Sequence, residues 1–270
     1  MIITHSSLIL SPSPELDLNV PVIGWSNLVR FGAVTADSED PLHPAANLSR
    51  DATTNRWQSL STATQHVTVD TSPDDPVDSF GIARHNLGSA QIKVSGEAYI
   101  GGSWVEVFPE QFLGDDSPVL WRFTTVPSAE LFRLKLQPTA AIAPTISVWY
   151  VGKLLYLQRR IYVGHTPLPY GREVDFTNGV AVNGDFQGRI ELSRRLTTSV
   201  SLQNVTPSWY RSNLDAFVAL GRKKPFFFAW RPYTYPREIG YAGLTNDPRP
   251  VNQRSNGMMQ ISLQMGGLVL

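Results

Sequence analysis

Short runs of alternating apolar and polar residues follow one another along the chain, and turn-forming residues separate them. In the first half, Val67 and Val69 share one face of the first predicted strand, 66–70. Further strands are predicted at 80–84, 90–94, 98–100, 103–108, 119–123, 131–136 and 146–151. Many short strands with turns between them are typical of a β-sandwich or barrel, and no helical period runs through this half.

The second half continues as strands and contains one helix. Strands are predicted at 173–176, 180–182, 187–193, 196–202, 226–230, 239–242 and 258–265. A helix is predicted near 208–221, with Thr206 or Ser208 as N-cap, Pro207 in its first turn and Gly221 at its end. The fold class is therefore mainly β, with a sandwich followed by a smaller α+β unit.

These patterns divide the chain into three parts. Residues 1–24 are apolar and proline-rich, which predicts an extended arm that packs on its own domain or on a neighbour. Residues 25–158 form the predicted sandwich, and 159–270 form the β-rich second domain. The stretch 162–172, with two prolines and two glycines, is the best candidate for a linker.

Two separate cores are expected from the apolar positions of these elements. The residues predicted for the first core are Val67, Val69, Ile82, Val94, Trp104, Leu134 and Val148. The residues predicted for the second core are Phe217, Phe227, Trp230 and Ile261.

The charges of the chain are few and unevenly placed. Charged residues make up 17% of the 270 residues, and the net charge is zero, which argues against a nucleic-acid binder. Residues 1–155 carry 9 Lys and Arg against 16 Asp and Glu, a net charge of −7, while residues 156–270 carry 14 against 7, a net charge of +7. This difference is either drift between two domains or a sign of complementary faces that bring copies together head to tail.

Recognisable catalytic chemistry is absent from the sequence. It has no cysteine, no nucleophile elbow, no P-loop, no dinucleotide-binding fingerprint and no paired zinc-binding histidines. We therefore expect no catalytic residue, no cofactor and no metal. The aspartates 70, 74, 75 and 78 fit a turn better than a calcium site, and the acids Glu97, Glu106 and Glu110 are the only hint of a glycosidase.

A sugar-binding platform is the remaining candidate site. Trp25 and Trp57 fall near predicted loops, where an aromatic ring can stack on a saccharide, although most tryptophans of small β-sandwiches belong to the core. We treat Trp25 and Trp57 as candidate glycan contacts.

The first half resembles the galactose-binding-like (discoidin-type) β-sandwich. The resemblance rests on Pro44-Ala45-Ala46-Asn47-Leu48 followed by Arg56-Trp57, on the segment from Ile82 to Gly88, on Gly102-Ser103-Trp104, and on the strand 131–136. It covers residues 30 to 150 and implies a jelly-roll sandwich. Members of this fold include sugar binders and purely structural modules, so the fold does not by itself assign a function.

The second half is similar to proteins of tailed-bacteriophage tail tips. The residues concerned are the segment 162–167, Gly188-Arg189, the predicted helix, the segment 227–232 and the glycine-rich end 256–268. This resemblance implies a non-enzymatic tail-tip, distal-tail or baseplate protein that forms a homo-oligomeric ring and contacts the tail tube and hub. Its place would be the virion, after synthesis in the bacterial cytoplasm.

Two alternatives remain open beside the structural role. In the first alternative, the sandwich is a carbohydrate-binding module for a host surface glycan. In the second, the chain is a polysaccharide-degrading enzyme. We expect no nucleic-acid partner and no membrane insertion, since no apolar run approaches the ~18 residues of a membrane span.

Overall fold

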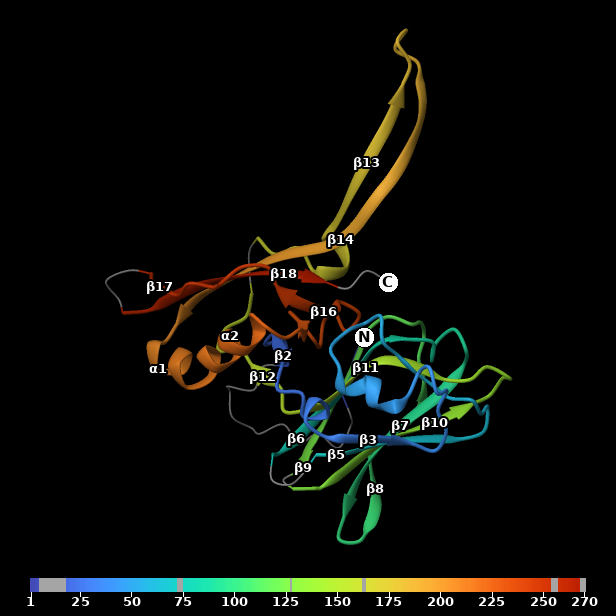
Figure 1. Cartoon of the computed structure of the whole chain (residues 1–270). Helices are drawn as coiled ribbons and strands as arrows, with labels where there is room; N and C mark the ends of the chain where they lie inside the picture. Colours follow the sequence, from blue (N-terminus) through green and yellow to red (C-terminus); the bar gives the residue numbers. More distant parts are fainter. Residues whose placement is uncertain (5–17, 72–74, 127, 162–163, 254–256, 268–270) are drawn as a thin grey trace.

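The strands of the chain form three sheets (Figure 1). The structure is a computed structural model, and it describes residues 1–4, 18–71, 75–126, 128–161, 164–253 and 257–267. Two five-stranded sheets lie in the first half of the chain and share one apolar core, which confirms the mainly β class and the predicted sandwich. The third sheet belongs mostly to the second half.

The two sheets of the sandwich are almost entirely antiparallel. The order of the first is β1 (Ile2–Thr4), β9 (Val119–Val126), β6 (Val77–His85), β11 (Thr145–Gly152) and β4 (Trp57–Gln58). The order of the second is β3 (Ala33–Ala36), β5 (Gln65–Asp70), β10 (Leu131–Pro138), β7 (Ile92–Ile100) and β8 (Ser103–Phe112). Single 3-10 turns, η1 (Leu28–Arg30) and η2 (Ala45–Ser49), pack against the same core.

The third sheet combines strands from both ends of the chain. Its order is β12 (Leu155–Tyr156), β2 (Val22–Gly24), β15 (Phe226–Ala229), β16 (Ile239–Leu244), β18 (Met259–Gly267), β14 (Phe186–Val205) and β13 (Arg172–Val180), and β17 (Val251–Asn252) pairs with β18. Apart from β1, the strands of the sandwich thus lie in sequence between β2 and β12, which are neighbours in the third sheet. The domain limits 25–158 and 159–270 stay predictions. The third sheet also includes β2, which precedes residue 25, and β12, which precedes residue 159.

The two described pieces of the predicted arm pack on the chain itself. β1 pairs in parallel with β9 of the sandwich, and β2 pairs with β15 and β12 of the third sheet. The remainder of the arm, residues 5–17, lies outside the described residues. Of the predicted linker, residues 168–170 form a 3-10 turn, η3 (Leu168–Tyr170), whose Leu168 is buried.

The predicted helix is present and covers one face of the third sheet (Figure 1). It runs without interruption through α1 (Pro207–Trp209), a π-helical turn (Tyr210–Leu214) and α2 (Asp215–Gly221). Thr206 is its N-cap, because its hydroxyl accepts a hydrogen bond from the Trp209 amide. Phe217 and Leu214 lie in the core between the helix and the sheet.

Most of the predicted core residues are buried, and two are not. Trp104 was predicted as a core residue, and this is wrong: it lies half-exposed on edge strand β8, with the Arg133 guanidinium 4.0 Å from its ring. Trp230 is also only half-buried, because it follows the end of β15 and stacks on Tyr235. The others are buried: Val67, Val69, Ile82, Val94, Leu134, Val148, Phe217, Phe227 and Ile261.

Two of these residues, Val148 and Phe227, belong to a core that was not predicted. This shared core joins the sandwich to the third sheet, and the Phe227 ring packs there at 5.8 Å from Tyr150 and 5.0 Å from Tyr241. Strand β6 explains why the two units meet so closely. Phe80 and Ile82 face the sandwich core, whereas a Cβ atom added to Gly81 on the other side would lie 3.1 Å from the Phe227 ring.

We expect Phe227→Ala to lower the free energy of unfolding by about 3–5 kcal/mol, because a fully buried phenylalanine is lost from the shared core. Urea unfolding measures the change. The matched control is Phe31→Ala, since Phe31 is 85% exposed and its loss should alter stability by no more than about 0.5 kcal/mol. A loss of less than about 1 kcal/mol in Phe227→Ala would contradict a shared core.

Candidate functional site

The two tryptophans predicted to contact a glycan do not form a platform. Trp57 is fully buried in the sandwich core, and its indole N–H donates to the Ser38 carbonyl. This burial corrects the prediction for Trp57, because a ring enclosed by the core cannot stack on a ligand. Trp25 is half-buried and packs edge-on against Phe217, with 6.2 Å between ring centroids.

A different aromatic pair lies on the surface of the sandwich. Tyr99 and Trp104 face each other across the β7–β8 hairpin with 5.3 Å between ring centroids. Arg133 covers one face of the Trp104 ring and forms an ion pair with Glu97. The sequence signal for this pair was the turn Gly101-Gly102, which brings the two aromatic positions into register.

Of the three glutamates considered for catalysis, Glu97 and Glu106 lie opposite each other on β7 and β8, and Glu110 lies further along β8. Glu97 pairs with Arg133 and Glu110 pairs with Lys93, so both carboxylates are engaged on the sheet surface. Asp78 is buried, and its carboxylate accepts the Leu154 amide; burial raises its pKa. Among the residues described, no group of three or more histidine, cysteine or acidic side chains could hold a metal ion.

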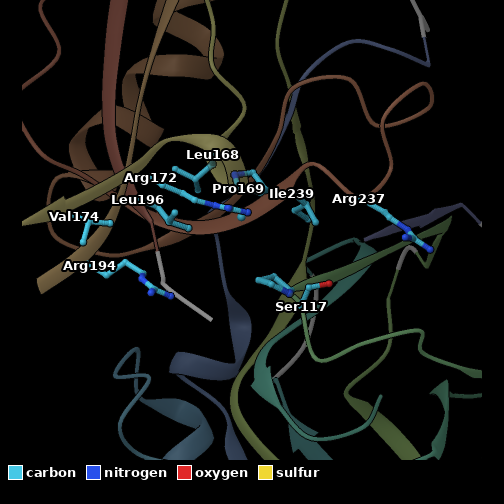
Figure 2. A pocket seen from close by; sticks show the side chains of 11 residues that line it. Ser117, Leu168, Pro169, Arg172, Val174, Arg194, Leu196, Arg237 and Ile239 are labelled. Atoms are coloured by element: carbon cyan, nitrogen blue, oxygen red, sulfur yellow. The ribbon is translucent and has the colours of Figure 1, made fainter. Parts of the chain in front are cut away.

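A cavity lies between the sandwich and the base of the β13–β14 hairpin (Figure 2). Its volume is about 480 Å³, within the range of ligand pockets. Four parts of the chain build it: the β8–β9 loop of the sandwich with Ser117 and Pro118, the turn η3 with Leu168, the base of the hairpin, and the start of β16 with the residues before it. Neither unit alone encloses this space.

The lining of the cavity is apolar and positively charged. Arg172, Arg194 and Arg237 line it, and no aspartate or glutamate does. Arg194 forms a two-pronged ion pair with Glu191, with N–O distances of 3.0 and 3.1 Å, whereas the Arg172 guanidinium has no hydrogen bond or ion pair with any described residue. The cavity therefore suits an apolar group that carries a negative charge.

The wall at Ser117 is held by a buried histidine. His85 Nε2 lies 3.1 Å from the Ser117 carbonyl, and His85 Nδ1 accepts the Leu87 amide at 3.2 Å. These partners fit a neutral ring with its proton on Nε2. Burial lowers the pKa of His85 to about 4, so this ring stays neutral at physiological pH.

The second candidate functional surface is the projecting β13–β14 hairpin. β14 pairs with β18 from Leu196 onwards. On the N-terminal side of Leu196, β13 and β14 pair only with each other among the described residues, and they extend away from the rest of the chain (Figure 1). Nine residues of β13 give the hairpin a reach of roughly 30 Å. Large apolar side chains along it are exposed: Phe176, Val180, Val182, Phe186, Ile190 and Leu192.

Cross-strand contacts make this hairpin a defined element. Arg195 lies 2.7 Å from Glu173, and the Thr197 hydroxyl donates to the same carboxylate, which lowers the pKa of Glu173. Nearer the tip, the Arg189 guanidinium lies 4.6 Å from the centre of the Phe176 ring. The sequence predicted strands here with breaks at 177–179 and at 194–195, and it therefore missed the continuous strand β13 and the single twenty-residue strand β14.

Comparisons with known proteins reach only part of the chain. No family model matches it, and no curated protein matches it. Solved structures similar to it include chitosan-binding module 1 of a chitosanase/glucanase from Paenibacillus sp. IK-5, at 18% identity and a TM-score of 0.42, covering 47% of this chain and 98% of that one. A Clostridium perfringens module, CpGH89CBM32-5, solved with GalNAc-β-1,3-galactose, is 15% identical at a TM-score of 0.42, with coverage of 47% and 100%.

A third similar structure is the CBM32 module of AlyQ in complex with 4,5-unsaturated mannuronic acid, at 21% identity and a TM-score of 0.37, covering 44% of this chain and 92% of that one. Such likenesses concern the fold of about half of the chain. None of the helices in the described part is long and apolar enough to cross a membrane.

We expect acid to destabilise the folded chain through His85. The pKa of this ring is 6.5 in an unfolded chain and about 4 when folded, so its contribution is complete above pH 6.5 and is lost as the pH falls towards 4. The loss from this group amounts to about 3 kcal/mol.

The measurement is the free energy of unfolding against pH for the parent chain and for His85→Gln. At pH 8 the two should differ only by the lost packing and hydrogen bonds, and between pH 6.5 and 4 the variant should lose less stability than the parent. Equal acid-induced losses in both proteins would show that His85 does not titrate in this way.

Proposed function

We propose that this chain is a non-enzymatic structural protein that binds further copies of itself through the β13–β14 hairpin, as a ring or layer of a phage tail tip or baseplate. The hairpin carries the proposal. An isolated two-stranded ribbon is marginally stable in water, and open strand edges invite pairing with another chain. Six large apolar side chains exposed on one such ribbon indicate a surface that is covered in an assembly.

The distribution of charge supports contact between unlike faces. The sandwich lies in the half with a net charge of −7, and the hairpin in the half with a net charge of +7. A ring requires each subunit to present two different patches that fit each other. From the tail-tip resemblance of the second-half sequence, we further infer that such a ring lies next to the tail tube and hub.

The test is a shortened hairpin. Val174 and Arg194 are directly opposite in the ladder, so residues 175–193 can be replaced by Asn-Gly, which closes a two-residue hairpin. We expect the parent chain to form oligomers in light scattering as its concentration rises, and the shortened chain to stay monomeric with an unchanged unfolding transition of the body.

The matched control removes exposed apolar side chains elsewhere. A Phe31→Ser and Leu42→Ser double variant should assemble like the parent, because these residues are exposed on the sandwich and not on the hairpin. Assembly of the shortened chain at the concentrations that suffice for the parent would contradict the proposal. So would a parent chain that stays monomeric up to its solubility limit and is absent from purified particles.

A second candidate function is recognition of a host surface glycan, and the exposed Tyr99–Trp104 pair favours it. Aromatic rings with one open face and nearby charged groups are suited to contact sugar rings and their hydroxyls. Here Arg133 and Glu97 lie next to the pair and could bind the hydroxyls of a saccharide. In this proposal the glycan contact lies on the β7–β8 hairpin and not at Trp25 or Trp57.

If the sandwich binds a glycan in this way, Trp104→Ala weakens binding of host polysaccharide roughly tenfold in a titration, because the stacking surface is lost. Trp25→Ala is the control and should bind like the parent. Equal affinity of the parent and Trp104→Ala, or no ligand for the parent on a glycan array, would refute this second function.

A further inference from the structure

The tip of the β13–β14 hairpin is apolar and carries one carboxylate. Val180, Val182 and Phe186 are exposed there, and Val182 is completely so. Asp185 lies between them in the turn, with its carboxylate held at 2.5 Å from the Asn183 side-chain amide. The tip thus presents a small apolar surface with a negative charge in a fixed position.

The arginine-lined cavity has the complementary character. Leu168, Leu196 and Ile239 supply apolar walls, and the guanidinium of Arg172 is free of partners among the described residues. Figure 2 shows Arg172 and Arg194 extending along the hairpin side of this space, opposite Ser117 of the sandwich. An apolar segment with one carboxylate satisfies both features of the lining.

From this match we propose that the hairpin tip of one copy docks into the arginine-lined cavity of the next copy. The proposal rests on the assembly function above and names the receiving surface. The tip cannot reach its own cavity, because Val174 and Arg194 at the base of the same hairpin form the cavity wall and the tip lies roughly 30 Å away. The occupant therefore comes from another molecule.

This contact is heterologous, and its geometry sets the repeat of the assembly. Each hairpin spans the distance from its own cavity to that of its neighbour, so successive copies are spaced by roughly 30 Å. Contacts between unlike patches close into a ring or continue as a filament, according to the rotation between copies.

Cross-linking tests the contact directly, since the chain has no cysteine of its own. Copies with Val182→Cys are mixed with copies with Ser117→Cys and treated with a short bismaleimide. We expect a covalent dimer that contains one copy of each variant. The control partner is Ser103→Cys, which sits exposed in the β7–β8 turn away from the hairpin and should give no such dimer.

A charge exchange tests the chemistry of the contact. Asp185→Arg alone and Arg172→Glu alone should each weaken assembly about tenfold, because each places like charges together. Mixing the two variants should restore assembly of alternating copies, since the arginine placed at position 185 of one variant then meets the glutamate placed at position 172 of the other. Both variants alter exposed side chains, so each should unfold at the midpoint of the parent.

The outcomes separate this contact from the assembly function. Oligomers that need the hairpin but give no Val182–Ser117 cross-link and no effect of charge exchange would overturn the docking site and leave the assembly function standing. Cross-links between two Val182→Cys copies would overturn it in favour of a tip-to-tip contact. A chain that neither assembles nor cross-links would overturn both.

Discussion

The packing of Phe227 against Gly81 is the constraint on which the arrangement of this protein depends. Strands β6, β9 and β11 are buried on both faces, because the sandwich core covers one side and the third sheet covers the other. Large side chains face the sandwich, while a glycine admits a phenylalanine ring on the opposite side. The two units therefore share a core, and Arg30 reinforces the junction by bonding both Asp51 of the sandwich and the Pro225 carbonyl.

This junction also creates the functional surfaces. The loop that carries Ser117 and the turn that carries Leu168 come together only because the sandwich is fixed against the third sheet. The resulting cavity concentrates positive charge where neither unit has a pocket of its own. Next to it, the third sheet continues into a hairpin that has no layer on either face within the described part of the chain. A covered face stabilises the chain, whereas an uncovered apolar ribbon is available to another molecule.

Composition and local pattern were sufficient for several features of the fold and for few features of the site. Alternation identified β5, a continuous apolar run identified the buried strand β15, and capping residues located the helix, because these signals depend on neighbours in sequence. The candidate glycan site was misplaced at Trp57, since a tryptophan near a predicted loop carries no local sign of whether a core will enclose it. The Tyr99–Trp104 pair emerged only when the hairpin register was known.

The sequence by itself determined a mainly β chain with one helix, few charges and opposite net charge on its two halves. These properties follow from composition and from periods of two or three to four residues. The tertiary structure alone decided that residues 22–24 and 155–156 lie side by side, that three arginines line one cavity, and that β14 projects from the body before Leu196 and joins β18 from Leu196 onwards. Each of these depends on pairing between residues far apart in the chain, which no local pattern encodes.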